Sequence, residues 1–299
     1  MERDPAGYGR STRTIELMTT QAEGITGNGE AGQEAERATR RIMFAGGKGG
    51  VGTTQIAANL AVALGLKHSR VLFVDATPGI VNTEVILGIN LTFDLRHVVT
   101  GEKSIEEIIC RGPGGIGILP VRRNWEPNAA LAPWQRERLS QGLAAATAAF
   151  DFVLVDAPAG IPAELPRAAL DPAEVIIVTT AEPTSLAGAY ATVKELARLS
   201  PGKKAGVIVN MASDRSEAAR AFRAIAHVAG RFLGTVPGYL GWVPADVSVT
   251  DAGRRQTPFV VQSPDQPAAG AVEVIASKLA TAQEGGDNLR FIDDESWRN

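Results

Sequence analysis

The chain has 299 residues, of which 44% are hydrophobic and 21% charged, and its formal net charge is −3. This length suits one large α/β domain better than two, and the weakly acidic balance gives no overall attraction to nucleic acid or anionic lipid. Cys110 is the single cysteine, so one chain forms no internal disulfide and supplies no thiolate cage for zinc or an iron–sulfur cluster.

Short β-branched runs alternate along the chain with longer patterns rich in alanine and leucine, as is typical of βαβ units. The predicted strands are 42–45, 71–75, 116–119, 152–156, 175–179, 207–210 and 232–236. The predicted helices are 55–66, 131–149, 185–199, 216–229 and 268–282. The sequence therefore predicts an α/β fold, a parallel twisted sheet of about seven or eight strands with helices on both faces.

Three segments are expected. Residues 1–39 are rich in Gly, Thr, Glu and Arg and can bury little surface, which predicts a flexible N-terminal arm. Residues 40–283 hold the alternating pattern and form the predicted domain, and residues 284–299 form a C-terminal tail. Because the carboxyl ends of parallel strands share one edge of the sheet, we expect any ligand to bind there.

A glycine-rich stretch joins the first predicted strand to the first predicted helix. Against the pattern G-x-x-x-x-G-K-[ST], Gly47 and Gly52 take the glycine positions and Thr54 takes the hydroxyl position that ligates Mg²⁺. Thr53 stands where the lysine is expected. The residues predicted to cradle phosphate are Gly47, Lys48, Gly49, Gly50, Val51, Gly52, Thr53, Thr54 and Gln55. An ordinary glycine-rich turn is the alternative, but the strand before and the helix after favour a phosphate loop.

The run Lys48-Gly49-Gly50-Val51-Gly52 resembles the deviant phosphate loop of the MinD/ParA family of P-loop ATPases. The resemblance implies that the chain binds ATP or ADP with Mg²⁺. It also implies an ATP-dependent homodimer in which Lys48 reaches the partner's phosphates. Replacing the second lysine by Thr53 removes a charge-assisted contact worth about 1.5–3 kcal/mol, or roughly a 10- to 150-fold loss of affinity.

Residues 75–88 resemble the family's first switch, D-x-D-x-G-x-x-N-x-(D/E)-x-x-L-G, except that Thr77 replaces the second aspartate. In active relatives that aspartate positions the attacking water, and a threonine hydroxyl cannot act as a carboxylate base. The resemblance therefore implies a catalytic set of Lys48, Asp75 and Asn82 that is impaired at Thr53 and Thr77.

Asp156 opens a segment similar to the family's second switch, D-x-P-A-G, and with Thr54 forms the predicted metal site. A strand-ending aspartate is otherwise a common cap or turn residue. Asn210 ends a predicted strand with an amide that could read an adenine edge. Pro244 and Asp246 lie in the loop that encloses the base in relatives, although Asn and Pro also close strands for turn reasons.

Residues 111–116 and 179–185 look like the FlhG/FleN flagellar regulators. Residues 21–25 are faintly similar to that branch's activating N-terminal segment, which would imply an SRP-type GTPase resembling FlhF as partner; a solvated arm is the alternative. The acidic C-terminal end argues against direct membrane binding. The start shows no signal-peptide pattern, so we expect a cytoplasmic protein that reaches the membrane through a partner. No sequence-specific nucleic-acid binding is expected, because paired arginines such as Arg254-Arg255 usually form a solvated face.

The leading hypothesis is a nucleotide-binding positional regulator of flagellar placement or number with weak or absent hydrolysis. One alternative is a slow but active ATPase of the same family. The other is a nucleotide-independent pilus-assembly scaffold resembling the TadZ/CpaE type.

Overall fold

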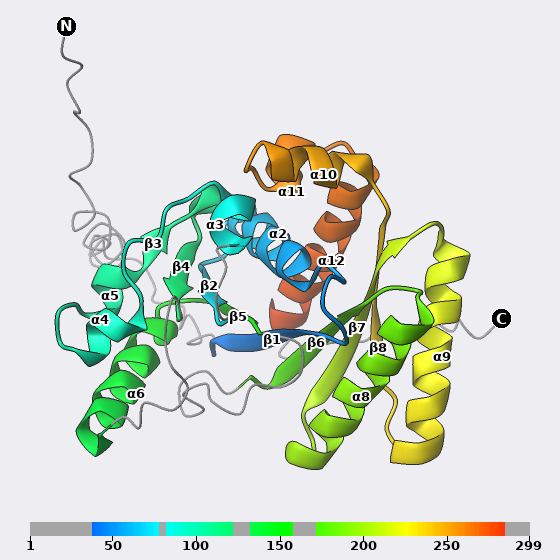
Figure 1. Ribbon diagram of the computed structural model, residues 1–299, viewed down its shortest axis with the longest axis horizontal. Helices are drawn as coiled ribbons and strands as arrows, with labels where there is room; N and C mark the ends of the chain where they lie inside the picture. The colour runs from blue at the N-terminus through cyan, green and yellow to red at the C-terminus, as the bar shows by residue number, and fades with distance from the viewer. Residues whose placement is uncertain (1–37, 78–81, 122–131, 158–171, 285–299) are drawn as a thin grey trace, which may run out of the picture.

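The structure, a computed structural model, describes residues 38–77, 82–121, 132–157 and 172–284. They build an eight-stranded sheet in the order β3-β4-β2-β5-β1-β6-β7-β8 (Figure 1). The strands are β1 Arg40–Gly46, β2 Val71–Asp75, β3 Cys110–Arg111, β4 Gly117–Pro120, β5 Phe152–Asp156, β6 Glu174–Thr179, β7 Lys204–Ala212 and β8 Gly238–Pro244. All pairs are parallel except β3 with β4. The predicted α/β class is confirmed.

Helices cover both faces of the sheet (Figure 1). They are α2 Thr53–Leu66, α3 Asn82–Leu87, α4 Leu95–Val99, α5 Ile105–Ile108, α6 Pro133–Ala148, α8 Pro183–Leu199, α9 Arg215–Leu233, α10 Val247–Arg254, α11 Phe259–Gln262 and α12 Pro267–Glu284. Strand β1 shows the two-sided burial: Ile42 and Phe44 join the core under α2 and α12, while Met43 and Ala45 join the core under α6, α8 and α9. Alternate residues of one strand therefore fill two separate cores.

Helix α2 is buried along most of its length, because the sheet, α12 and a glycine turn surround it. That turn is a 3-10 segment, Pro113–Gly115. A Cβ at Gly65 of α2 would lie 2.6 Å from the carbonyl oxygen of Gly114, so the two backbones meet without side chains between them. Residues 111–116, which resemble the flagellar branch, thus have a packing role against the helix that follows the phosphate loop.

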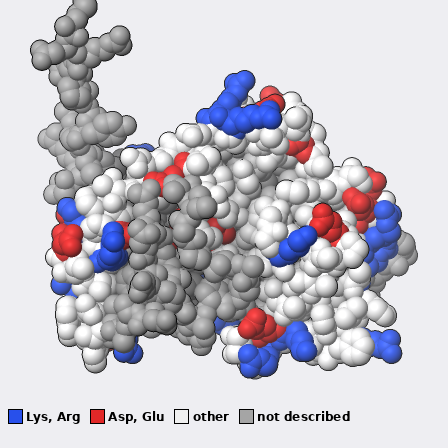
Figure 2. All heavy atoms as spheres, viewed as in Figure 1, with Lys and Arg blue, Asp and Glu red and all other residues white. Residues whose placement is uncertain are grey.

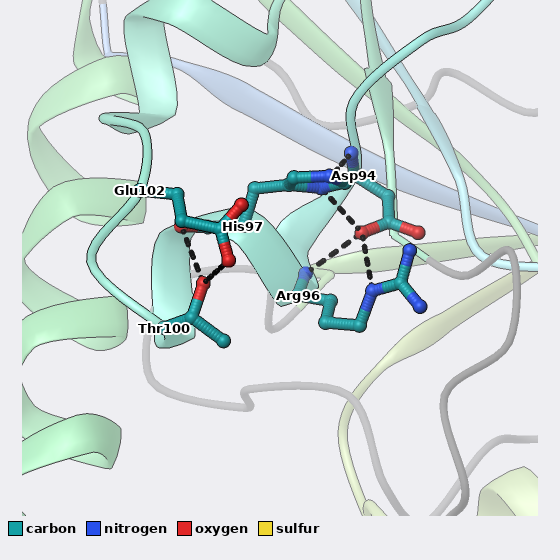
Figure 3. Close-up of polar contacts among 5 residues, drawn as sticks. All are labelled: Asp94, Arg96, His97, Thr100 and Glu102. Carbon is teal, nitrogen blue, oxygen red and sulfur yellow. Dashed lines mark hydrogen bonds and ion pairs between the residues drawn. The ribbon is translucent and has the colours of Figure 1, made fainter.

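Between α3 and β3 the chain forms two short helices, and each begins with a capping box. Asp94 starts α4 by accepting a hydrogen bond from Arg96 N–H at 3.0 Å, while its own N–H donates to His97 Nδ1 at 3.2 Å (Figure 3). At the other end of α4, Thr100 Oγ1 lies 3.2 Å from the His97 carbonyl oxygen and 2.9 Å from Glu102 Oε1. Local side chains thus satisfy backbone groups that such short helices leave open.

The predicted strand 232–236 is wrong. Helix α9 continues to Leu233 and ends at Gly234, whose φ of 65° is the left-handed conformation typical of a helix terminator. Phe232 and Val236 are 66% and 56% exposed, so their apolar character does not mark a buried strand. The strand at this edge is β8, and Gly241 within it hides the apolar pattern that would have revealed it.

The expected arm and tail lie almost entirely outside the described residues, so the boundaries at 39 and 284 stay predictions. Within the described ranges, no helix has both the length and the apolarity that crossing a bilayer requires.

Candidate nucleotide site

The phosphate loop connects β1 to α2 at the carboxyl edge of the sheet (Figure 1). Gly50 and Gly52 have φ values of 84° and 86°, a left-handed conformation that side chains disfavour. No side chain caps the start of α2 at Gly52. The backbone donors of the first helical turn, together with the positive end of the helix dipole, form an environment that suits an anion.

Two neighbouring elements hold this loop in place. Gly47 packs directly on α8, where a Cβ at Gly47 would overlap the backbone of Gly188 and Ala189. On the other side, the Asn210 amide at the end of β7 donates a 2.9 Å hydrogen bond to the Val51 carbonyl. The shape of the loop is therefore set by backbone contacts and one buried amide, and none of these depends on Thr53.

The two side chains at the lysine positions of the loop point to different places. Thr53 folds back onto the end of β1, where a Cβ at Gly46 would lie 2.6 Å from its hydroxyl oxygen. Lys48 Nζ extends to α8 and lies 3.2 Å from both Glu182 Oε2 and Thr184 Oγ1. Glu182 and Thr184 were not predicted as site residues, and only their place in the flagellar-branch resemblance could have indicated them.

Two aspartates end adjacent strands beside the loop. Asp75 of β2 and Asp156 of β5 are direct partners in the parallel register. Thr77 donates to Asp75 Oδ1 both through its backbone N–H, at 3.1 Å, and through its hydroxyl, at 2.6 Å. The residue that replaces the second switch aspartate is thus bonded to the first one.

Asp156 is fully buried, and within the described residues neither of its carboxylate oxygens has a hydrogen-bond partner. Burial raises the pKa of this carboxyl to about 7; the nearby Thr54 hydroxyl lowers it in part, although its geometry falls short of a hydrogen bond, and the charge of Asp75 raises it further. A buried carboxylate without a partner, with a hydroxyl and a second carboxylate at hand, fits a hard divalent cation such as Mg²⁺.

The remaining predicted site residues differ in their surroundings. Asn82 is the exposed first residue of α3, next to residues 78–81, which lie outside the described part of the chain. Gln55 Oε1 accepts a hydrogen bond from Asn59 at 3.2 Å. Pro244 ends β8 beside Ala212. The second-switch residues 158–160 also fall outside the described ranges.

Asp246 has a structural role in this fold. One carboxylate oxygen accepts from Ser248 N–H at 2.9 Å and caps α10, and the other accepts from Ala268 N–H at 3.0 Å at the start of α12. The side chain thereby ties β8 to two helices. Because both carboxylate oxygens of Asp246 already accept backbone hydrogen bonds, we expect Asp246 to contribute to base binding by shaping its loop.

Figure 2 shows basic and acidic groups interspersed across the visible face. Arg254, half of the arginine pair noted in the sequence, lies 3.0 Å from Asp251 of the same helix.

Comparison with known proteins identifies the family. A profile described as an AAA domain matches residues 39–205. The antiactivator FleN of Pseudomonas aeruginosa is 33% identical over 238 residues, which cover 80% of this chain and 85% of that protein. The flagellum site-determining protein YlxH of Helicobacter pylori is 35% identical over 52% of this chain and 53% of its own length. The solved structure of the septum site-determining protein MinD from Pyrococcus horikoshii, complexed with Mg-ADP, has a TM-score of 0.63 at 28% identity and covers 82% of this chain and 99% of that one. The chain therefore belongs to the MinD/ParA family of P-loop ATPases, in its FleN/FlhG branch.

Proposed function

We propose that this protein is a nucleotide-binding positional regulator of flagellar placement or number that binds ATP or ADP with Mg²⁺ and hydrolyses ATP weakly or not at all. One observation carries the proposal. The backbone cradle is complete while Thr53 and Thr77, the two residues that depart from the catalytic pattern, are turned toward Gly46 and Asp75. Binding depends mainly on the first feature and turnover on the second.

In this proposal the loop from Gly47 to Gly52 holds the phosphates through its backbone N–H groups. The Thr54 hydroxyl and the Asp156 carboxylate hold Mg²⁺, which would neutralise charge on the phosphate oxygens. Asn210 donates to Val51 through its amide nitrogen. Its amide oxygen is the group left to accept from an adenine amino group.

Hydrolysis needs a group that orients the attacking water and a cation at the leaving oxygens. Thr77 offers neither a carboxylate nor a free hydroxyl, because its hydroxyl proton is engaged by Asp75 at 2.6 Å. Thr53 carries no charge. We therefore expect nucleotide occupancy, and not turnover, to set the state of the protein.

The proposed partners follow from the family. The names of FleN and YlxH, an antiactivator and a flagellum site-determining protein, support a flagellar role. Lys48 supports an ATP-dependent homodimer. An FlhF-like GTPase is the proposed regulated partner, and recruitment through a partner is the proposed route to the membrane from the cytoplasm.

The experiment pairs calorimetry with a phosphate-release assay. Purified protein with Mg²⁺ is expected to bind ATP or ADP saturably and to release no phosphate above the background set by Lys48→Ala. Robust Mg²⁺-dependent release that Lys48→Ala abolishes would instead establish the slow ATPase. Absence of any nucleotide binding would favour a scaffold that works without nucleotide.

The first prediction is that Thr53→Lys combined with Thr77→Asp increases phosphate release by on the order of 100-fold or more, because general-base catalysis alone contributes about 10²–10⁴-fold. The matched controls are Thr53→Met and Thr77→Asn, which approximate the shapes without the charges. Equal release by the restored protein and these controls would show that some other feature limits turnover.

A further inference from the structure

Lys48 is held within its own subunit. Its ammonium lies 3.2 Å from the Glu182 carboxylate and 3.2 Å from the Thr184 hydroxyl, at the start of α8. Glu182 is the residue just before that helix and Thr184 belongs to its first turn. Two polar groups of one helix end therefore bind the cation of the phosphate loop.

The start of α8 is held against the phosphate loop, so it is not free to move together with the Lys48 side chain. A Cβ on Gly188 would overlap the Gly47 carbonyl, so α8 and the loop are in backbone contact one residue away from Lys48. Thr180 Oγ1 also donates to Ser185 Oγ at 2.9 Å, which braces the turn that leads into α8. The flexible part of this arrangement is the lysine side chain itself.

We propose that Glu182 and Thr184 form a latch that retains Lys48 in its own subunit. The latch competes for Lys48 with the phosphates of the nucleotide that a second copy of the chain binds across the dimer. One ammonium cannot occupy both places. The inference rests on the proposed function, because it assigns the regulation of the same nucleotide-dependent dimer. Release of the latch leaves the Glu182 carboxylate unneutralised near the phosphate loop, and this adds a second cost to dimer formation.

The strength of this latch is modest, which suits a contact that must open. The side chains of Lys48 and Glu182 are 48% and 65% exposed. Exposed ion pairs of this kind change equilibria by about two- to fivefold. The latch therefore adjusts the threshold for dimer formation and does not block it.

The test begins without nucleotide. Amine labelling followed by peptide mass spectrometry measures the reactivity of Lys48 in wild type, Glu182→Gln and the control Glu195→Gln, which alters another glutamate of α8. Glu182→Gln is expected to label Lys48 about two- to fivefold faster than wild type. Glu195→Gln is expected to match wild type. Unchanged labelling of Lys48 in Glu182→Gln overturns the latch, whatever nucleotide does.

The second arm measures the dimerisation constant by analytical ultracentrifugation with a non-hydrolysable ATP analogue. Each dimer opens two latches, so Glu182→Gln is expected to tighten the dimer by about four- to 25-fold, and Lys48→Ala is expected to remove that gain. Faster labelling without any binding of the analogue leaves the latch standing and defeats the proposed function. Faster labelling with a dimer that forms equally in wild type and Glu182→Gln overturns the competition.

Discussion

The phosphate loop and the neighbouring ends of β2 and β5 serve one proposed ligand but are built on different principles. The loop consists of backbone conformations supported by contacts at Gly47, Gly52 and Val51. The strand ends consist of side chains, among which Asp156 is buried without a partner and Asp75 is bonded to Thr77. We therefore expect the loop to tolerate a changed side chain at Thr53, whereas the strand ends depend on the identity of their side chains.

Under the proposed function, this difference explains how an ATPase fold would keep nucleotide binding while losing turnover. A backbone cradle depends on which residues permit left-handed conformations and close contacts, and Thr53 disturbs neither. Catalysis depends on a charged group at a defined place, and Thr77 carries no charge where the family pattern has an aspartate. Variants in each region measure whether the loop and the strand ends can be altered independently.

The largest expected effect concerns Asp156. Its pKa rises from 3.8 in the unfolded chain to about 7 in the folded protein, so the native state retains a proton that the unfolded chain releases. This destabilisation is absent below pH 4, grows as the pH rises toward 7 and is complete above it. It should reach at most about 4 kcal/mol in Mg²⁺-free buffer.

Urea unfolding of wild type and Asp156→Asn at several pH values between 4 and 8 measures this cost. Relative to the variant, wild type is expected to lose stability as the pH rises. The control Asp251→Asn changes an exposed carboxylate that is 54% accessible and should follow wild type. Parallel curves for wild type and Asp156→Asn would show that the buried carboxylate is not destabilising.

The second effect concerns the contact between the loop and α8. Gly188→Ala places a methyl group against the Gly47 carbonyl, and overpacking of this kind costs about 1–3 kcal/mol. The matched control is Gly270→Ala in α12, where a Cβ meets no neighbouring atom and helix propensity should add up to about 1 kcal/mol. In thermal unfolding, Gly188→Ala is expected to lower the melting temperature and Gly270→Ala to raise it. Only Gly188→Ala is expected to weaken nucleotide binding. A stabilising Gly188→Ala would mean that the loop is not seated on α8.

The smallest effect concerns Asn210. Asn210→Ala leaves the Val51 carbonyl without its 2.9 Å hydrogen bond and should cost about 1–2 kcal/mol of unfolding free energy. Asn210→Asp should lower the unfolding free energy at least as much, because it places a carboxylate, which only accepts hydrogen bonds, against the Val51 carbonyl oxygen. Equal stability of wild type and both variants would show that the loop does not need this amide.

Much of the fold follows from local pattern. The strand at 152–156 and the start of the phosphate loop are recognisable because a continuous apolar run ends in a polar or glycine-rich edge. Strand β8 is not recognisable in this way. Gly241 interrupts its apolar run, and the exposed apolar pair Phe232 and Val236 presents a stronger local pattern outside any strand.

Residue identity and short-range spacing were enough to predict the family, the parallel sheet, the phosphate loop and the uncharged residues at Thr53 and Thr77. The partners of the side chains around the loop became visible only in the folded molecule. It bonds Thr77 to Asp75, docks Lys48 on Glu182 and Thr184, and leaves Asp156 buried without a partner. The Thr77 contact is local, but Lys48 and Thr184 lie 136 positions apart. No local pattern encodes the Lys48 contact or the burial of Asp156, because both exist only once the strands are assembled into the sheet.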